Sequence, residues 1–147
     1  MGQTHWQDIT ALVTRMLRTW CAARAIGEDP LLQMRRCALP PAQLPHFVAA
    51  CDSLFGMTEA ALERRLATAR CCSARLSRDE AAVLAILRYA PVAGAVHTSR
   101  SVPHGLPDTL RWSALAVLEA LDVDPVVTSV DIVETRCPFD APAERAA

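Results

Sequence analysis

The chain contains no lysine and few aromatic residues, and its charges nearly balance. All fifteen basic residues among its 147 are arginines, which face sixteen acidic residues and leave a formal net charge of -1. A net charge so close to zero argues against a dedicated nucleic-acid-binding protein, because such a domain is normally strongly basic. Hydrophobic residues make up 52% of the chain and charged residues 21%, which excludes a disordered protein and predicts one packed domain.

The chain also lacks a segment typical of export or of membrane insertion. No run reaches the roughly 18 uninterrupted apolar residues that a membrane-spanning helix needs. Residues 1–6 show neither the basic start nor the apolar core of a secretory signal peptide. We therefore expect a cytoplasmic protein with no membrane partner, whose six cysteines are free thiols in a reducing compartment.

Signatures of catalysis and of metal binding are missing as well. The chain has no C-x-x-C, H-E-x-x-H or G-x-S-x-G motif and no phosphate-binding or dinucleotide-binding glycine pattern. Two histidines lie in a polar loop over residues 92–107, a place typical of catalytic groups, but no motif accompanies them. We therefore favour a protein that is not an enzyme and has no cofactor. The alternative is zinc or another soft metal held by Cys37, Cys71 and Cys72.

Apolar residues recur at helical spacing along most of the chain. The pattern predicts five main helices, over about 6–26, 44–56, 59–70, 78–91 and 109–121, and a turn or short helix near 31–34. The predicted fold is all-α, a compact bundle of about five helices forming one domain over residues 1–137. A β-branched run at 126–133 predicts a short extended segment, and residues 138–147 are expected to be a flexible tail.

Specific residues predict where these helices begin and end. Gly27 and Gly56 are expected to end the first two, and Thr58 to cap the third. Ser77–Glu80 has the pattern of a capping box, in which the hydroxyl and the carboxylate each accept a hydrogen bond from a backbone N–H. Pro91 is expected to stop the fourth helix, because proline cannot donate the next backbone hydrogen bond.

Charge is distributed unevenly between two parts of the chain. One stretch without acidic residues carries a net charge of +5 from Arg64, Arg65, Arg70, Arg75 and Arg78. The last 29 residues, from Glu119, carry seven acids and two arginines, a net charge of -5. The two parts are either solvated separately or docked on each other, within one chain or between copies. Docking would use complementary charges, which fix the register of an interface.

The fifth predicted helix is apolar almost all round. Such a helix is either central to the core or covered by a partner chain. The second interpretation makes Trp112, Leu115 and Leu118 candidate interface residues and predicts a homodimer, with a different protein partner as a further possibility. Our favoured hypothesis is accordingly a non-catalytic interaction or regulatory module of the cytoplasm.

Adjacent cysteines give the alternative hypothesis, a thiol-based redox- or metal-responsive protein. Cys71 and Cys72 lie inside the arginine-rich stretch, and nearby cations favour the reactive thiolate form. The plainer interpretation places one cysteine in the core and the other on the surface, with the arginines solvated or paired with acids.

Three short segments, taken in order, resemble an uncharacterised family of small bacterial proteins. They are Arg35-Arg36-Cys37-Ala38, then Phe55-Gly56, then the segment from Cys71 to Glu80. That family shows R-R-M-A, F-G, and a C-C pair followed by R-M-T-x-D-E. The chain departs from it at Cys37, Leu76 and Ser77, which stand for methionine, methionine and threonine. The resemblance implies no activity, because none is attached to the family.

Overall fold

The structure is a computed structural model that describes residues 6–37, 44–95 and 108–122. These residues form helices α1 (Trp6–Ala25), α2 (Pro30–Arg35), α3 (Leu44–Leu62), α4 (Arg78–Ala95) and α5 (Asp108–Ala120), with no strand among them. The predicted all-α class is confirmed. The extended segment 126–133, the tail 138–147 and both histidines of the 92–107 loop lie outside the described residues. Within the described part, no helix combines the length and apolar character that crossing a membrane would require.

Helix α1 ends as its sequence predicts. Gly27 has a φ of 75°, a left-handed conformation that glycine adopts without a steric penalty. The N–H of Glu28 donates to the carbonyl oxygen of Ala23 (2.9 Å), and the N–H of Gly27 donates to that of Arg24 (3.3 Å). These two bonds define a Schellman motif, so the predicted C-terminal glycine of α1 is confirmed.

Helix α3 differs from the prediction. It runs without interruption through Gly56 and Thr58 to Leu62, so the predicted end at Gly56 and the separate helix over 59–70 are both wrong. Thr58 does not act as a cap, because its hydroxyl donates to the carbonyl oxygen of Leu54, one turn back in the same helix (2.7 Å). After α3, Glu63 has a φ of 53°, and the chain is not helical again until α4. The described residues therefore form four long helices where five were predicted, and the short α2 lies where the sequence predicted a turn or short helix near 31–34.

Helix α4 begins as predicted and ends later than predicted. Its capping box is formed in both directions: the N–H of Glu80 donates to Ser77 Oγ (3.1 Å), and the N–H of Ser77 donates to Glu80 Oε2 (2.7 Å). Pro91 was expected to stop the helix, but α4 continues through it to Ala95. Arg111 of α5 donates from Nε to the carbonyl oxygen of Ala90 (3.2 Å), which ties α5 to this part of α4.

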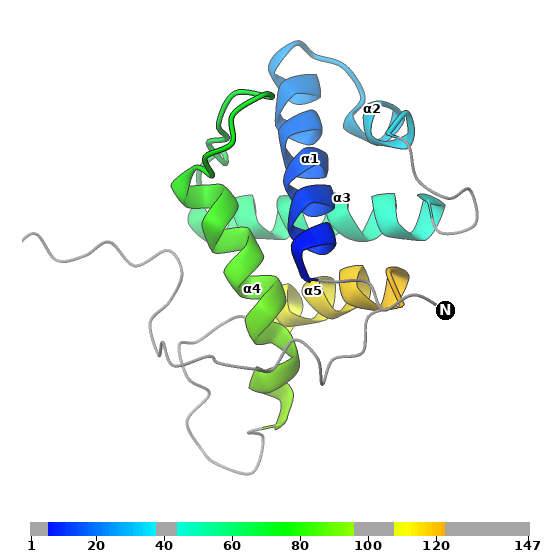
Figure 1. The fold of residues 1–147 in the computed structure, drawn as a ribbon, viewed down its shortest axis with the longest axis vertical. Coiled ribbons are helices and arrows are strands. Elements are labelled where there is room, and N and C mark those ends of the chain that lie inside the picture. The colour runs from blue at the N-terminus through cyan, green and yellow to red at the C-terminus, as the bar shows by residue number, and fades with distance from the viewer. Residues whose placement is uncertain (1–5, 38–43, 96–107, 123–147) are drawn as a thin grey trace, which may run out of the picture.

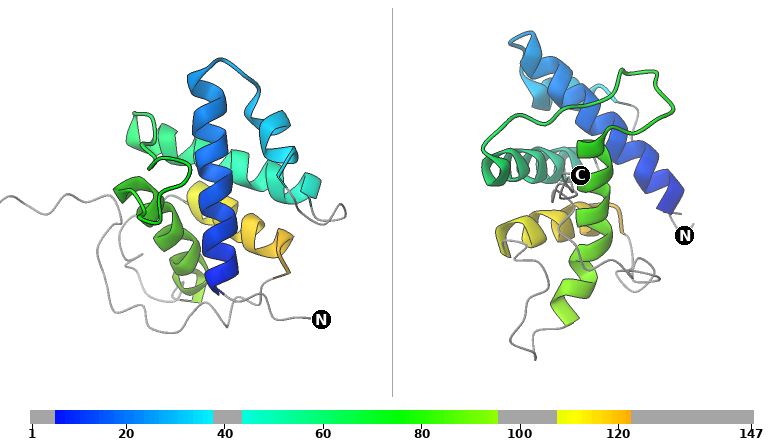
Figure 2. Two further views of the ribbon diagram at one scale, coloured as in Figure 1. Left: turned by 45° about the horizontal axis from the view of Figure 1, so that its top comes forward. Right: turned by 90° about the vertical axis from the view of Figure 1, so that its left-hand side faces the viewer.

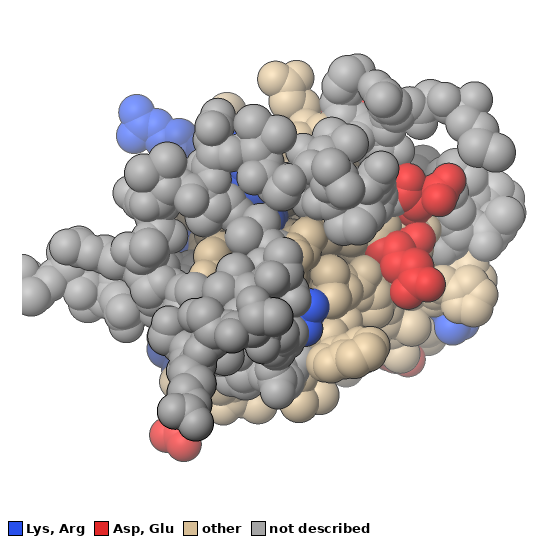
Figure 3. Space-filling model, turned by 90° about the horizontal axis from the view of Figure 1, so that it is seen from below, with Lys and Arg blue, Asp and Glu red and all other residues tan. Residues whose placement is uncertain are grey.

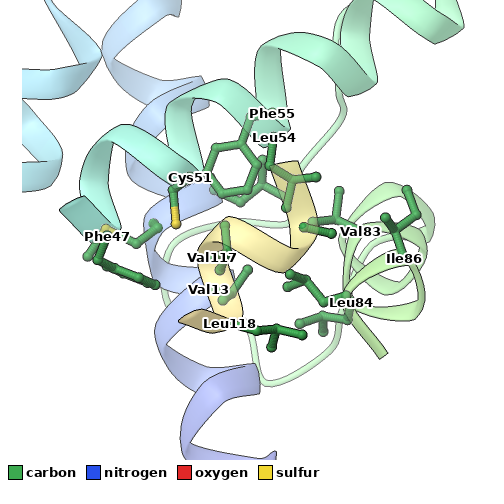
Figure 4. Close-up of a cluster of buried hydrophobic side chains, with 14 of the residues drawn as sticks. Val13, Phe47, Cys51, Leu54, Phe55, Val83, Leu84, Ile86, Val117 and Leu118 are labelled. Atoms are coloured by element: carbon green, nitrogen blue, oxygen red, sulfur yellow. The ribbon is translucent and has the colours of Figure 1, made fainter. Parts of the chain in front are cut away.

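The helices pack around one apolar core. Helix α5 lies beside α3, and α1 crosses α3 on another side, as Figure 1 shows. The two further views in Figure 2 show α4 running across the direction of the α3 and α5 pair. In Figure 4, Val13 of α1, Phe55 of α3, Val83 of α4 and Val117 of α5 point into one shared space. This core leaves the opposite side of α1 free to face the segment between α3 and α4.

Candidate functional site

The non-helical residues 63–77 form a segment, named here the 63–77 segment, whose backbone is held by carboxylates. The N–H of Leu66 donates to Glu59 Oε1 (2.8 Å), that of Ala67 to Asp79 Oδ2 (2.7 Å), and that of Ala69 to Glu80 Oε1 (3.1 Å). Glu59 lies on α3, and the other two acids lie in the first turn of α4. The flanking helices thus supply the hydrogen-bond acceptors that a helical backbone would have supplied itself.

Arg18 of α1 joins the 63–77 segment to α4. Its guanidinium donates from Nε to Glu80 Oε1 (2.7 Å) and from Nη2 to Glu80 Oε2 (3.2 Å). It also donates to three carbonyl oxygens, those of Cys71 (3.3 Å), Ser73 (2.9 Å) and Arg75 (3.1 Å). These five bonds equal in number the five N–H groups of an arginine side chain. The carboxylate that accepts two of them, that of Glu80, is fully buried. One ion pair therefore fixes the positions of α1, α4 and the segment together.

The two acids at the start of α4 are held in their charged form. Burial acts to raise the pKa of Glu80, but hydrogen bonds from Arg18 and from the N–H groups of Ser77 and Ala69 outweigh it, and the pKa lies below its ordinary value. Arg64 forms a two-bond ion pair with Asp79 (2.7 and 2.9 Å), and that hydrogen bonding lowers the pKa of Asp79. The hydrogen bonds to Glu80 and to Asp79 in turn raise the pKa of Arg18 and of Arg64.

A groove of about 1110 Å³ lies between α1 and the 63–77 segment. Figure 2 shows the segment passing across α1, on the side turned away from α5. The groove is lined by Thr14 and Arg15 of α1 and by Arg65, Arg70, Cys71 and Leu76 of the segment, among others. The hydroxyl of Thr14 is buried and forms no hydrogen bond with any described residue. The face seen from below in Figure 3 shows charged side chains and no continuous patch of arginine among the residues that are drawn in colour.

The five arginines predicted as interaction residues fall into two groups. Arg64 is occupied by its ion pair with Asp79. The other four are exposed and form no side-chain hydrogen bond or ion pair within the described part of the chain: Arg65, Arg70, Arg75 and Arg78. Two of them line the groove, together with Arg15. Arg15 and Arg18 were not among the predicted interaction residues, although their spacing places both on the polar side of α1.

The adjacent cysteines lie together on the surface. Both Cys71 and Cys72 are exposed, so the interpretation that buries one of them is wrong. Their sulfur atoms are 3.4 Å apart, and this contact raises the pKa of the Cys72 thiol, whereas the sequence suggested a lowered pKa. Cys37 does not join them; its sulfur contacts the Thr19 hydroxyl at 3.9 Å. No group of three or more His, Cys, Asp or Glu side chains gathers within the described residues in a way that could hold a metal ion.

The candidate interface residues of α5 do not share one surface. Trp112 is 69% exposed, Leu115 is partly buried, and Leu118 is only 2% exposed. Packing of α5 against α3 and α4 explains the apolar character of the helix. The prediction of Leu118 as an interface residue is therefore corrected, because its side chain belongs to the core of its own chain.

No known protein-family model matches the chain, and neither a curated protein nor a solved structure matches it. The resemblance to small bacterial proteins stays a prediction. Its segments lie at the end of α2, inside α3, and from Cys71 into the start of α4. A function for the chain must therefore be argued from the groove and its charges.

Proposed function

We propose that the protein is a non-catalytic cytoplasmic interaction module that self-associates through the groove. In this proposal the acidic C-terminal part of one copy, from Glu119 onward, binds the groove of a second copy. The observation that carries the proposal is the division of the arginines around α1 and the 63–77 segment into a paired set and an unpaired set.

The paired set forms the scaffold. Arg18 binds Glu80, Arg24 binds Glu59, and Arg64 binds Asp79. These three pairs occupy Glu80, Glu59 and Asp79, whereas Glu63 of the segment and Glu28, which also lines the groove, form no ion pair among the described residues. Arg15, Arg65 and Arg70 along the groove likewise have no acidic partner within that part of the chain. Like charges held close together repel one another, so an acidic partner is favoured there over a neutral or basic one.

The remaining chemistry of the groove suits a peptide segment. Leu76 and Ile26 are large apolar side chains exposed at the groove, 43% and 71% respectively. A segment that carries both acids and apolar residues would pair with the arginines and cover these two apolar side chains.

The chain itself has a segment of that composition. Residues 126–134 read V-V-T-S-V-D-I-V-E, and the 29 residues from Glu119 hold seven acids against two arginines. Opposite charges steer such a segment to the groove and fix its register more than they add affinity. Reciprocal exchange of this segment between two copies closes a symmetric dimer, the commonest form of homo-oligomer.

Sedimentation velocity on the full chain over a range of concentrations tests the proposal. We expect a dimer at about 0.1 M salt and a shift toward monomer at about 1 M, where charges are screened beyond about 3 Å. The double variant Arg65→Glu/Arg70→Glu is expected to be monomeric. Its matched control is Arg35→Glu/Arg36→Glu, which makes the same change in net charge at two exposed arginines at the end of α2. The control variant is expected to remain dimeric.

A second full-length variant tests the other half of the contact. Neutralising five of the six acids that follow α5 is expected to give a monomer, with Asn or Gln replacing Asp124, Asp131, Glu134, Asp140 and Glu144. A wild-type chain that is monomeric at every concentration, as it would be if the segment bound its own groove, contradicts the proposal. Equal effects of the groove variant and its control contradict it too.

A further inference from the structure

Cys71 and Cys72 lie in a tight turn with their thiols in contact. The N–H of Ser73 donates to the carbonyl oxygen of Arg70 (2.9 Å), so the two cysteines occupy the two central positions of a β-turn. Both side chains are exposed, and the sulfur atoms are 3.4 Å apart. A disulfide needs about 2.05 Å between its sulfur atoms, so bonding requires a local change of the turn and no movement of a helix.

The peptide group between the two cysteines is one that Arg18 holds. The carbonyl oxygen of Cys71 belongs to this peptide, and it accepts the longest of the five Arg18 hydrogen bonds, at 3.3 Å. A disulfide between adjacent residues closes an eight-membered ring that contains the peptide bond and twists it, because a relaxed planar trans peptide keeps the two side chains too far apart. Closure therefore turns this carbonyl away from Arg18.

The other contacts of Arg18 do not depend on that peptide. Its two bonds to Glu80 and its bonds to the carbonyl oxygens of Ser73 and Arg75 lie outside the ring. The fold is therefore retained when the ring closes, whereas Arg70 and Cys71, which line the groove, are displaced.

From this geometry we infer that Cys71 and Cys72 form a reversible oxidation site for low-molecular-weight disulfides, and that closing the ring changes the wall of the groove. The effect on self-association rests on the function proposed above. The oxidation itself does not.

The reaction balances with the disulfide as the oxidant. The thiolate of Cys71 attacks one sulfur of R–S–S–R, which forms a mixed disulfide and releases one R–S⁻ that takes up the proton lost by Cys71. The Cys72 sulfur then attacks Cys71 Sγ, the Cys71–SR bond breaks, and the second R–S⁻ leaves with the proton of Cys72. Two thiols are oxidised to one disulfide, and the oxidant is reduced to two R–SH molecules. An excess of R–SH reverses both steps.

Intact-mass analysis and peptide mapping of the full chain after treatment with glutathione disulfide test the site. The wild type is expected to lose two hydrogen atoms at Cys71 and Cys72 and to retain no adduct. Cys72→Ser is expected to keep one glutathione on Cys71, because the second thiol is gone. Cys37→Ser is the control and is expected to react as the wild type does. Unmodified thiols, a retained adduct in the wild type, or a disulfide only between chains overturns the inference.

Hydrogen exchange tests the effect on the groove wall without relying on dimer formation. The amide of Ser73, which is bonded inside the turn, is expected to exchange about fivefold or more faster in the oxidised chain, while core amides of α3 keep their rates. An unchanged rate at Ser73 contradicts the displacement. If the wild type dimerises, oxidation is expected to change the dimer dissociation constant by about fivefold or more. A closed ring with an unchanged constant overturns the regulatory part alone.

Discussion

The helical core and the 63–77 segment adjoin in the chain, but different forces hold them. In the helices the backbone hydrogen bonds close internally, and stability comes from apolar side chains such as Phe47, Leu54 and Leu87, all fully buried. In the segment the backbone N–H groups of Leu66 and Ala67 depend on carboxylates of neighbouring helices. One region is held by apolar burial and the other by charge, so mutations and pH should separate them.

The largest expected effect is that of removing the carboxylate at the centre of the charged region. Glu80→Ala leaves Arg18 without its counter-charge and two backbone N–H groups without acceptors. Breaking a buried ion pair in this way lowers the free energy of unfolding by about 3–5 kcal/mol. Urea denaturation measures this loss, with Asp8→Ala at an exposed acid of α1 as control. A loss below about 1 kcal/mol would show that the charged region contributes little to the fold.

Acid sharpens the comparison, because Asp79 and Glu80, whose pKa values are lowered in the folded chain, both belong to the charged region. The pKa values of Asp79 and Glu80 lie below their ordinary values in the folded chain, so on acidification the unfolded chain binds protons first. Their contribution to stability is complete above about pH 5 and is lost as the pH falls through the folded values. Urea denaturation as a function of pH is expected to show a shallower acid loss for Glu80→Ala than for the wild type. Phe55→Ala, a core change of about 3–5 kcal/mol, should follow the wild-type slope.

The smallest expected effect is a gain inside the helical region. Gly56 lies in the middle of α3, its φ is not left-handed, and a Cβ built there meets no atom within 4 Å. Gly56→Ala should therefore raise the free energy of unfolding by about 0.5–1 kcal/mol, measured by thermal or urea denaturation. If α3 ended at Gly56, as the sequence alone suggested, the same change would lower the stability instead.

Local signals in the sequence predicted local features well. The end of α1 at Gly27 and the capping box of Ser77 and Glu80 both involve residues a few positions apart, and both are confirmed. The errors at Thr58 and Pro91 come from residues that have two uses, since each can end a helix or be tolerated inside one.

The groove could not be predicted because its contacts are distant in the sequence. The arginine-rich stretch was recognised from its charge, but no periodic pattern indicates that Glu59, Asp79 and Glu80 hold its backbone. Nor does any local signal identify Arg18, which lies 53 to 62 positions from its acceptors. Only the packed structure therefore shows which arginines form ion pairs and which have no acidic partner among the described residues.

The long separation between Arg18 and Glu80 also has a consequence for how the chain is made. At a translation rate of about 5–20 residues per second, the ribosome adds Glu80 about 3–12 s after Arg18, since 62 positions separate them. During that interval a nascent α1 can pair with the neighbouring α2, but its guanidinium has no counter-ion from α4. The Arg18–Glu80 contact therefore waits for the start of α4, and the packing of α5 against α3 and α4 can form only after that.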